Sequence, residues 1–144
     1  MTRAGDFVDL FSEGKGFFFD VIKRVNDDLK HRYLTNDYKM MVLLKKLGRT
    51  QLKDIADFVG SKPLACTQLG NLERKKMVLR EVDPKNKRNV YYLISPSGEK
   101  YVGQMMKEIR VSLGKIFSNL SAKDMSDFAA ALKTLNAIMA KAVK

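Results

Sequence analysis

The stretch between residues 52 and 93 constrains the fold of this chain more than any other part. Two segments in it have apolar side chains at helical spacing, and two later segments are rich in β-branched and aromatic residues, as strands are. In chain order, the expected helices are residues 52–59 and 62–77, and the expected strands are residues 78–82 and 90–94. A helix-turn-helix followed by a hairpin with a charged tip predicts a winged helix, whose second helix fits the major groove of duplex DNA.

Two further helices are expected before this segment. Phe18 and Ile22 begin an apolar stripe with helical spacing, which predicts an amphipathic helix over about residues 6–31. Thr35 is expected to cap a second helix that ends at Leu47 and is apolar on most sides, so we expect it to be central and buried.

Two long helices are expected after the hairpin. Ser95-Pro96 begins the first of them, and a capping box of Ser121 with Asp124 begins the second. The predicted fold class is therefore mainly α (α+β). We expect one domain over residues 1–144, with a winged helix at about 34–95 and dimerisation helices at about 6–31 and 96–142.

The charge of the chain is positive and unevenly distributed. The net charge is +11, and residues 61–90 contribute 8 basic and 3 acidic side chains, whereas residues 1–60 contribute 11 and 9. Lys and Arg gathered on one surface displace counterions from phosphates, so this concentration predicts a nucleic-acid partner, double-stranded DNA. The alternative is a solvated basic face that only keeps the chain soluble.

Apolar side chains form narrow stripes along the two C-terminal helices. The first stripe includes Val102, Met106 and Ile109, and the second runs from Met125 to Ala142 with steps of three and four residues. Stripes of this kind pack against another helix. The alternative is packing within the chain, but two such stripes outside the winged helix favour a homodimer. The residues expected at its interface are Phe18, Ile22, Phe128, Leu132, Leu135 and Met139.

Several short motifs occur in a fixed order along nearly the whole chain. Leu34-Thr35 precedes the second helix, and Ile55-Ala56 lies in the third. Residues 72–80 run from Leu72-Glu73 at the end of the fourth helix to Leu79-Arg80 in the first strand. Asp83 and Arg88 lie in the hairpin, and residues 93–98 lead into the fifth helix. In this order and spacing the motifs resemble the MarR family of transcription regulators. The chain departs from the family pattern at Asn86, where the family has a wing aspartate, and at Lys76, where it has a glycine.

The resemblance implies a homodimer that places two winged helices on a palindromic operator, with half-sites roughly 10 base pairs apart. It also implies a repressor that a small apolar effector releases from DNA. Phe7, Phe11 and residues 17–19, together with methionines, are candidates to line an effector pocket, and the alternative is that they form plain core.

The candidate DNA contacts fall in two groups. Arg88 and Lys87 at the hairpin tip have no core to pack against, and Arg suits a narrow minor groove. On the second helix of the motif, Gln and Asn can pair with adenine, and Thr can touch a phosphate or a thymine methyl. Two alignments with the family pattern place either Thr67-Gln68 or Cys66-Thr67 at the base-reading position, and helical periodicity favours Thr67 as exposed. The full set is Lys62, Pro63, Thr67, Gln68, Asn71, Arg74, Lys85, Lys87 and Arg88.

Other chemistry has little support in the sequence. Cys66 is the one cysteine, either a redox switch or a small buried apolar residue, and His31 is the one histidine, so no metal site or cofactor is expected. No nucleophile–base constellation or phosphate-binding loop suggests an enzyme. The absence of a signal peptide or membrane span predicts a cytoplasmic protein. The alternative function is a winged-helix protein-interaction or architectural module that binds nucleic acid non-specifically.

Overall fold

The computed structural model describes residue 13 and residues 18–144. The chain divides into two compact units, the first ending at Ile109 and the second comprising Arg110–Lys144. The described part of the N-terminal helix covers residues 18–28. It is followed by α2 (Asn36–Leu47), β1 (Thr50–Gln51), α3 (Leu52–Val59), α4 (Lys62–Arg74), β2 (Val78–Val82), β3 (Val90–Ile94), α5 (Pro96–Phe117) and α6 (Ala122–Ala142).

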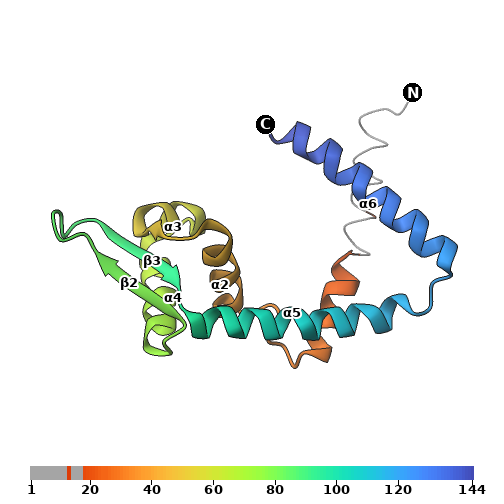
Figure 1. Ribbon diagram of the computed structural model, residues 1–144, viewed down its shortest axis with the longest axis horizontal. Coiled ribbons are helices and arrows are strands. Elements are labelled where there is room, and N and C mark those ends of the chain that lie inside the picture. Colours follow the sequence, from red (N-terminus) through yellow and green to blue (C-terminus); the bar gives the residue numbers. More distant parts are fainter. Residues whose placement is uncertain (1–12, 14–17) are drawn as a thin grey trace. The chain divides into compact units, whose positions relative to one another are not determined.

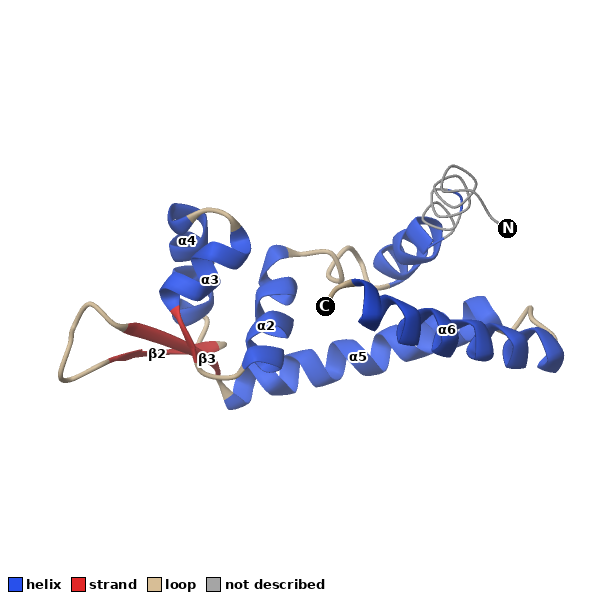
Figure 2. Ribbon diagram, turned by 90° about the horizontal axis from the view of Figure 1, so that it is seen from above, coloured by secondary structure: helices blue, strands red, loops and turns tan. Residues whose placement is uncertain are grey.

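The first unit contains the expected winged helix. The strands form an antiparallel sheet in the order β1-β3-β2, and β2 pairs with β3 from Val78 opposite Ile94 to Val82 opposite Val90. Figures 1 and 2 show β2 and β3 extending away from α2, α3 and α4 to a long connecting loop. The bounds predicted for α2, α3, β2 and β3 are confirmed, whereas the two-residue β1 was not predicted, because two residues are too few to show a periodicity.

The core of this unit lies among α2, α3, α4 and the start of α5. Leu44 of α2, Ile55 of α3 and Leu69 of α4 are fully buried, as each amphipathic pattern requires. On α5, Val102 and Met105 are buried, but Met106 is 42% exposed. The residues of α5 that face the winged-helix core are therefore three apart, and Met106 of the predicted stripe lies outside this core. The packing of that stripe against another helix stays a prediction.

The end of α4 differs from the prediction of a helix to residue 77. The helix ends at Arg74, because Lys76 has a left-handed backbone with φ of 61°. The amide of Lys76 donates to the carbonyl of Glu73 (2.9 Å), and the amide of Met77 donates to that of Leu72 (2.9 Å). This pair of bonds is the Schellman motif, in which the left-handed residue is usually glycine.

Replacing Lys76 with glycine is expected to stabilise the protein by about 0.5–1 kcal/mol. A left-handed backbone costs a residue with a Cβ about 1–2 kcal/mol, and the greater freedom of glycine in the unfolded chain offsets part of that gain. Urea unfolding measures the difference. The matched control is Lys76→Ala, which removes the same charge but keeps the Cβ. If both variants were stabilised equally, backbone strain would not be the cause.

The N-terminal helix ends earlier than residue 31. Lys30 and His31 have φ of 53° and 63°, and the amide of His31 donates to the carbonyl of Asn26 (2.7 Å), so the helix stops at residue 28. The start of α2 follows the prediction, because the hydroxyl of Thr35 accepts a hydrogen bond from the amide of Tyr38 (3.2 Å). The predicted start of the first helix lies outside the described residues.

The second unit contains the end of α5 and all of α6. The predicted capping box is present: the amide of Asp124 donates to the hydroxyl of Ser121 (3.0 Å), and the carboxylate of Asp124 accepts from the amide of Ser121 (3.4 Å). Phe117 and Phe128 pack with ring centroids 5.6 Å apart. Beyond this contact the apolar stripe of α6 is largely exposed, and it includes Met125, Leu135, Ile138 and Met139.

Candidate nucleic-acid interface

The orientation of α4 is fixed by its cap and by its buried face. The Ser61 hydroxyl accepts a hydrogen bond from the amide of Leu64 (3.3 Å), and a proline in the first turn suits the start of a helix. Ala65, Leu69 and Leu72 are completely buried. With 3.6 residues per turn, the side of α4 opposite these three residues must face outward.

Three of the predicted contact residues lie on this outward side. Pro63, Thr67 and Arg74 are exposed, and Asn71 beside them is half-buried. The Thr67 hydroxyl donates to the carbonyl of Pro63 (3.0 Å), which leaves its methyl group and oxygen lone pairs for other contacts. Arg74 donates a hydrogen bond to the side-chain oxygen of Asn71, so the amide and the guanidinium form one polar cluster.

The remaining predicted residues of α4 lie on its flanks. Gln68 is half-buried and lines a groove that α4 forms with α2 and α3. Lys62 is exposed on the other flank, where it lines a cleft towards the hairpin. Cys66 is exposed, so the interpretation of this thiol as a buried apolar residue is wrong. The structure thus brings Pro63, Thr67, Asn71 and Arg74 together on the outward side of α4 and places Gln68 and Lys62 on its two flanks, with Gln68 next to Asn71 along the helix.

The base of the hairpin is anchored to the segment before α3. Arg49 donates to the carboxylate of Glu81 (2.6 Å), and its guanidinium lies 3.7 Å from the centre of the Tyr91 ring. The hydrogen bond to Glu81 raises the pKa of Arg49. The side-chain amide of Gln51 donates to the side-chain oxygen of Asn89 (2.9 Å). These contacts hold the hairpin against the helix-turn-helix.

The tip of the hairpin is shaped by two turns in which side-chain oxygens accept from the backbone. Asp83 accepts from the amide of Lys85 (2.9 Å), and Asn86 accepts from the amide of Arg88 (3.1 Å). Asn86 therefore supports the backbone of Arg88, although it lacks the charge of an aspartate. Lys85, Lys87 and Arg88 are all exposed.

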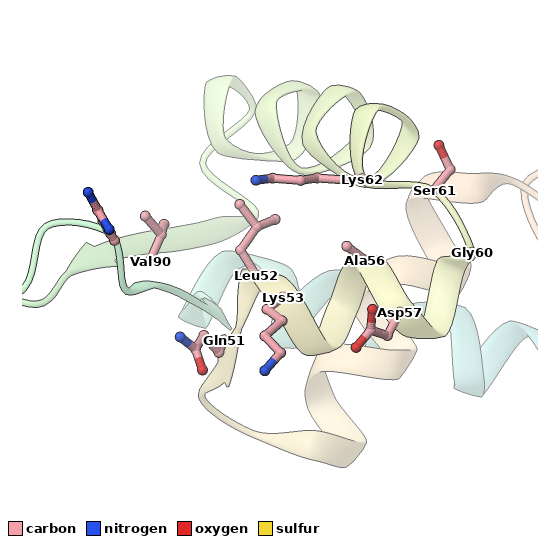
Figure 3. Close-up of a pocket in the computed structure, with 10 residues that line it drawn as sticks. Gln51, Leu52, Lys53, Ala56, Asp57, Gly60, Ser61, Lys62 and Val90 are labelled. Carbon is pink, nitrogen blue, oxygen red and sulfur yellow. The ribbon is translucent and has the colours of Figure 1, made fainter.

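An open cleft of about 420 Å³ lies between α3, the start of α4 and the hairpin. Figure 3 shows Leu52, Lys53, Ala56 and Asp57 on α3, with Ser61 and Lys62 at the start of α4 and Val90 on β3. Lys53, Lys62 and Arg88 outnumber the single carboxylate of Asp57 among the lining residues, so the cleft is electropositive.

Comparisons with known proteins agree with this architecture. The sequence matches no protein-family model. An uncharacterised HTH-type transcriptional regulator of Bacillus subtilis, YkoM, is 26% identical over 114 residues, which cover 76% of this chain and 71% of YkoM. A MarR family protein from Bacillus stearothermophilus has a similar structure with a TM-score of 0.76, 14% identity and coverage of 97% of this chain and 99% of that chain. This chain has the MarR fold. A MepR variant of S. aureus bound to an oligodeoxyribonucleotide gives a TM-score of 0.64 at 22% identity, covering 92% and 97% of the two chains.

Four residues that the sequence analysis did not predict line the cleft or the groove beside α4. Lys53 and Asp57 of α3 line the cleft, and Leu64 of α4 and Phe58 of α3 are exposed apolar side chains on the groove beyond it. Helical spacing could have found Leu64, which stands four residues before Gln68. No local pattern could have found Lys53, because its position depends on how α3 packs against the hairpin.

Other kinds of site find no support in the described residues. Among residue 13 and residues 18–144, no three His, Cys, Asp or Glu side chains lie close enough to hold a metal ion. No helix in the part of the chain that the structure describes is long and apolar enough to cross a membrane.

Proposed function

We propose that this protein is a DNA-binding transcriptional regulator and not an enzyme. One observation carries the proposal. The outward side of α4 lies next to a cationic cleft, and this cleft continues to the exposed hairpin tip. A helix with an outward polar cluster can enter a major groove, and cations beside it can bind the phosphates that border that groove.

Each part of this surface has a separate role in the proposal. Thr67 and Asn71 on the outward side of α4 contact bases, and Arg74 contacts a phosphate. Lys62 and Arg88, on either side of the cleft, bind the sugar–phosphate backbone that passes between α4 and the hairpin. Lys85 and Lys87 extend this contact along the hairpin tip. Gln68 remains a candidate at the edge of the surface, because its flank position lets only the end of its side chain reach a base.

Residues 1–144 form a single domain in this proposal. Two copies of the chain form a homodimer that binds a palindromic operator. Its support is the stripe of α6, in which Leu135 and Met139 are exposed and Phe128 and Leu132 are half-buried. On the N-terminal helix, Phe18 is exposed and Ile22 half-buried. Exposed apolar side chains at helical spacing are expected to be covered by a partner. A repressor that a small apolar effector releases from DNA follows from the resemblance alone, since Phe7, Phe11 and Phe17 lie outside the described residues.

We expect sequence-selective binding to duplex DNA that weakens steeply with salt. Duplexes selected by the protein from a randomised library are compared with random duplexes by titration at 50 and 200 mM salt. If the dimer neutralises 6–10 phosphates, affinity for both falls by about a thousandfold to a hundred-thousandfold across this range. Arg88→Ala is expected to weaken binding to both duplexes by a similar factor. It should also reduce the slope of log affinity against log salt concentration by about 2 per dimer.

The control variant is Arg110→Ala, which removes an exposed arginine outside the winged helix and should leave affinity and slope unchanged. Equal affinity for selected and random duplexes at both salt concentrations would contradict the regulator and favour the architectural module instead.

A further inference from the structure

One apolar side chain stands among the polar residues of α4. Leu64, Gln68 and Asn71 are four and three residues apart, so they form one row along the helix. Gln68 and Asn71 carry amides that suit base edges, but Leu64 carries no polar atom in its side chain and is 47% exposed. It lies in the first turn of α4, the end of a recognition helix that usually contacts bases.

The surroundings of Leu64 are also apolar and open. Leu64 and Gln68 line a groove of about 250 Å³ with residues of α2 and α3, among them Leu43 and Val59. Phe58, also in this groove, is 72% exposed. Lys39 is the one cation among the residues that line the groove. Such a surface can contact an apolar group of a nucleotide while the nearby cation contacts a phosphate.

Base edges in the major groove offer one apolar group, the C5-methyl of thymine. A leucine in the same row as two amides would meet this methyl group when the amides meet base edges. We propose that Leu64 contacts a thymine methyl and so specifies a T·A base pair next to the position that Gln68 faces. This inference rests on the proposed function, since it needs α4 to enter a major groove.

Replacing thymine with deoxyuridine tests the contact directly, because it removes the methyl group and keeps the hydrogen-bonding edge. In a duplex selected from a randomised library by the protein, each thymine is replaced in turn and affinity is measured. We expect one position per half-site at which deoxyuridine weakens binding by about fourfold, the effect of losing one buried methyl group. Leu64→Ala should bind the thymine and deoxyuridine duplexes equally at that position.

Leu47→Ala is the matched control, because Leu47 is an equally exposed leucine (48%) at the far end of α2. It should keep the fourfold preference for thymine. Urea unfolding of both variants is expected to show the same cooperative transition as the wild-type protein, which checks that the fold is kept.

The outcomes separate this inference from the function on which it rests. If the wild-type protein selects no sequence, the regulator itself is contradicted and the inference falls with it. If it selects a sequence but tolerates deoxyuridine at every position, or if Leu64→Ala keeps the preference, the regulator stands and the inference is overturned. Leu64 would then belong to a surface for another protein.

Discussion

Replacing Gly98 with alanine is expected to destabilise the protein by about 3 kcal/mol or more. A Cβ at this position would lie 2.2 Å from the carbonyl oxygen of Met77 and 2.7 Å from Cγ1 of Ile94. The backbone there cannot yield easily, because the Met77 carbonyl also accepts from the amide of Ser95 (3.0 Å), whose hydroxyl accepts from the amide of Gly98 (3.0 Å). Overpacking of a tight site typically costs about 1–3 kcal/mol, and contact with backbone places this case at the upper end.

Urea unfolding of Gly98→Ala and of Gly103→Ala makes the comparison. Gly103 is on the same helix, and a Cβ there would meet nothing within 4 Å, so alanine should stabilise it by up to about 1 kcal/mol through helix propensity. A Gly98→Ala protein as stable as the wild type would show that α5 can move away from Met77 at little cost.

Two glutamates in the stripe of α6 are expected to abolish the proposed dimer and with it most of the DNA affinity. Leu135 and Met139 are four residues apart on α6 and both are exposed. If a partner covers them, an unpaired charge at either position costs several kcal/mol. Sedimentation of Leu135→Glu/Met139→Glu should give a monomer at micromolar concentration. Its affinity for a palindromic duplex should fall by at least about a hundredfold, because two linked half-sites bind together.

The control is Ala130→Glu/Ala137→Glu, which adds the same charge on the opposite side of α6, where both residues are exposed. This variant should remain a dimer with unchanged affinity. A wild-type protein that sediments as a stable monomer would refute the dimer and remove the reason for a palindromic operator.

Much of the winged helix could be predicted from the sequence because its signals are local. The Thr35 cap, the glycine after α3 and the β-branched residues of β2 and β3 each act on their own neighbours, and their bounds are confirmed. The buried face of α5 was harder to predict, because Val102 is followed by apolar residues both three and four positions later, and either spacing fits a helix. Only the packing of α5 on the winged helix selects Met105 over Met106 for burial.

The sequence could predict which residue types form the candidate site better than it could predict where each side chain lies. Exposure of Thr67 followed from the burial of Leu69 and Leu72, which periodicity fixes. The flank position of Gln68 depends on how α2 and α3 pack against α4, and one residue in a helix rotates a side chain by about 100°. The left-handed backbone of Lys76 could not be predicted from its residue type, because lysine rarely adopts that conformation.

The junction between α4 and α5 limits how this protein can change shape. The Lys76 carbonyl accepts from the Ser95 hydroxyl (2.7 Å), and the Met77 carbonyl accepts from the Ser95 amide (3.0 Å). These two bonds tie the first turn of α5 to the residues that end α4, so the two segments are expected to move together. In the proposed dimer, a change that separates the two copies of α4 would therefore bend α5 farther along its length, or rotate each winged helix together with that first turn as one rigid body.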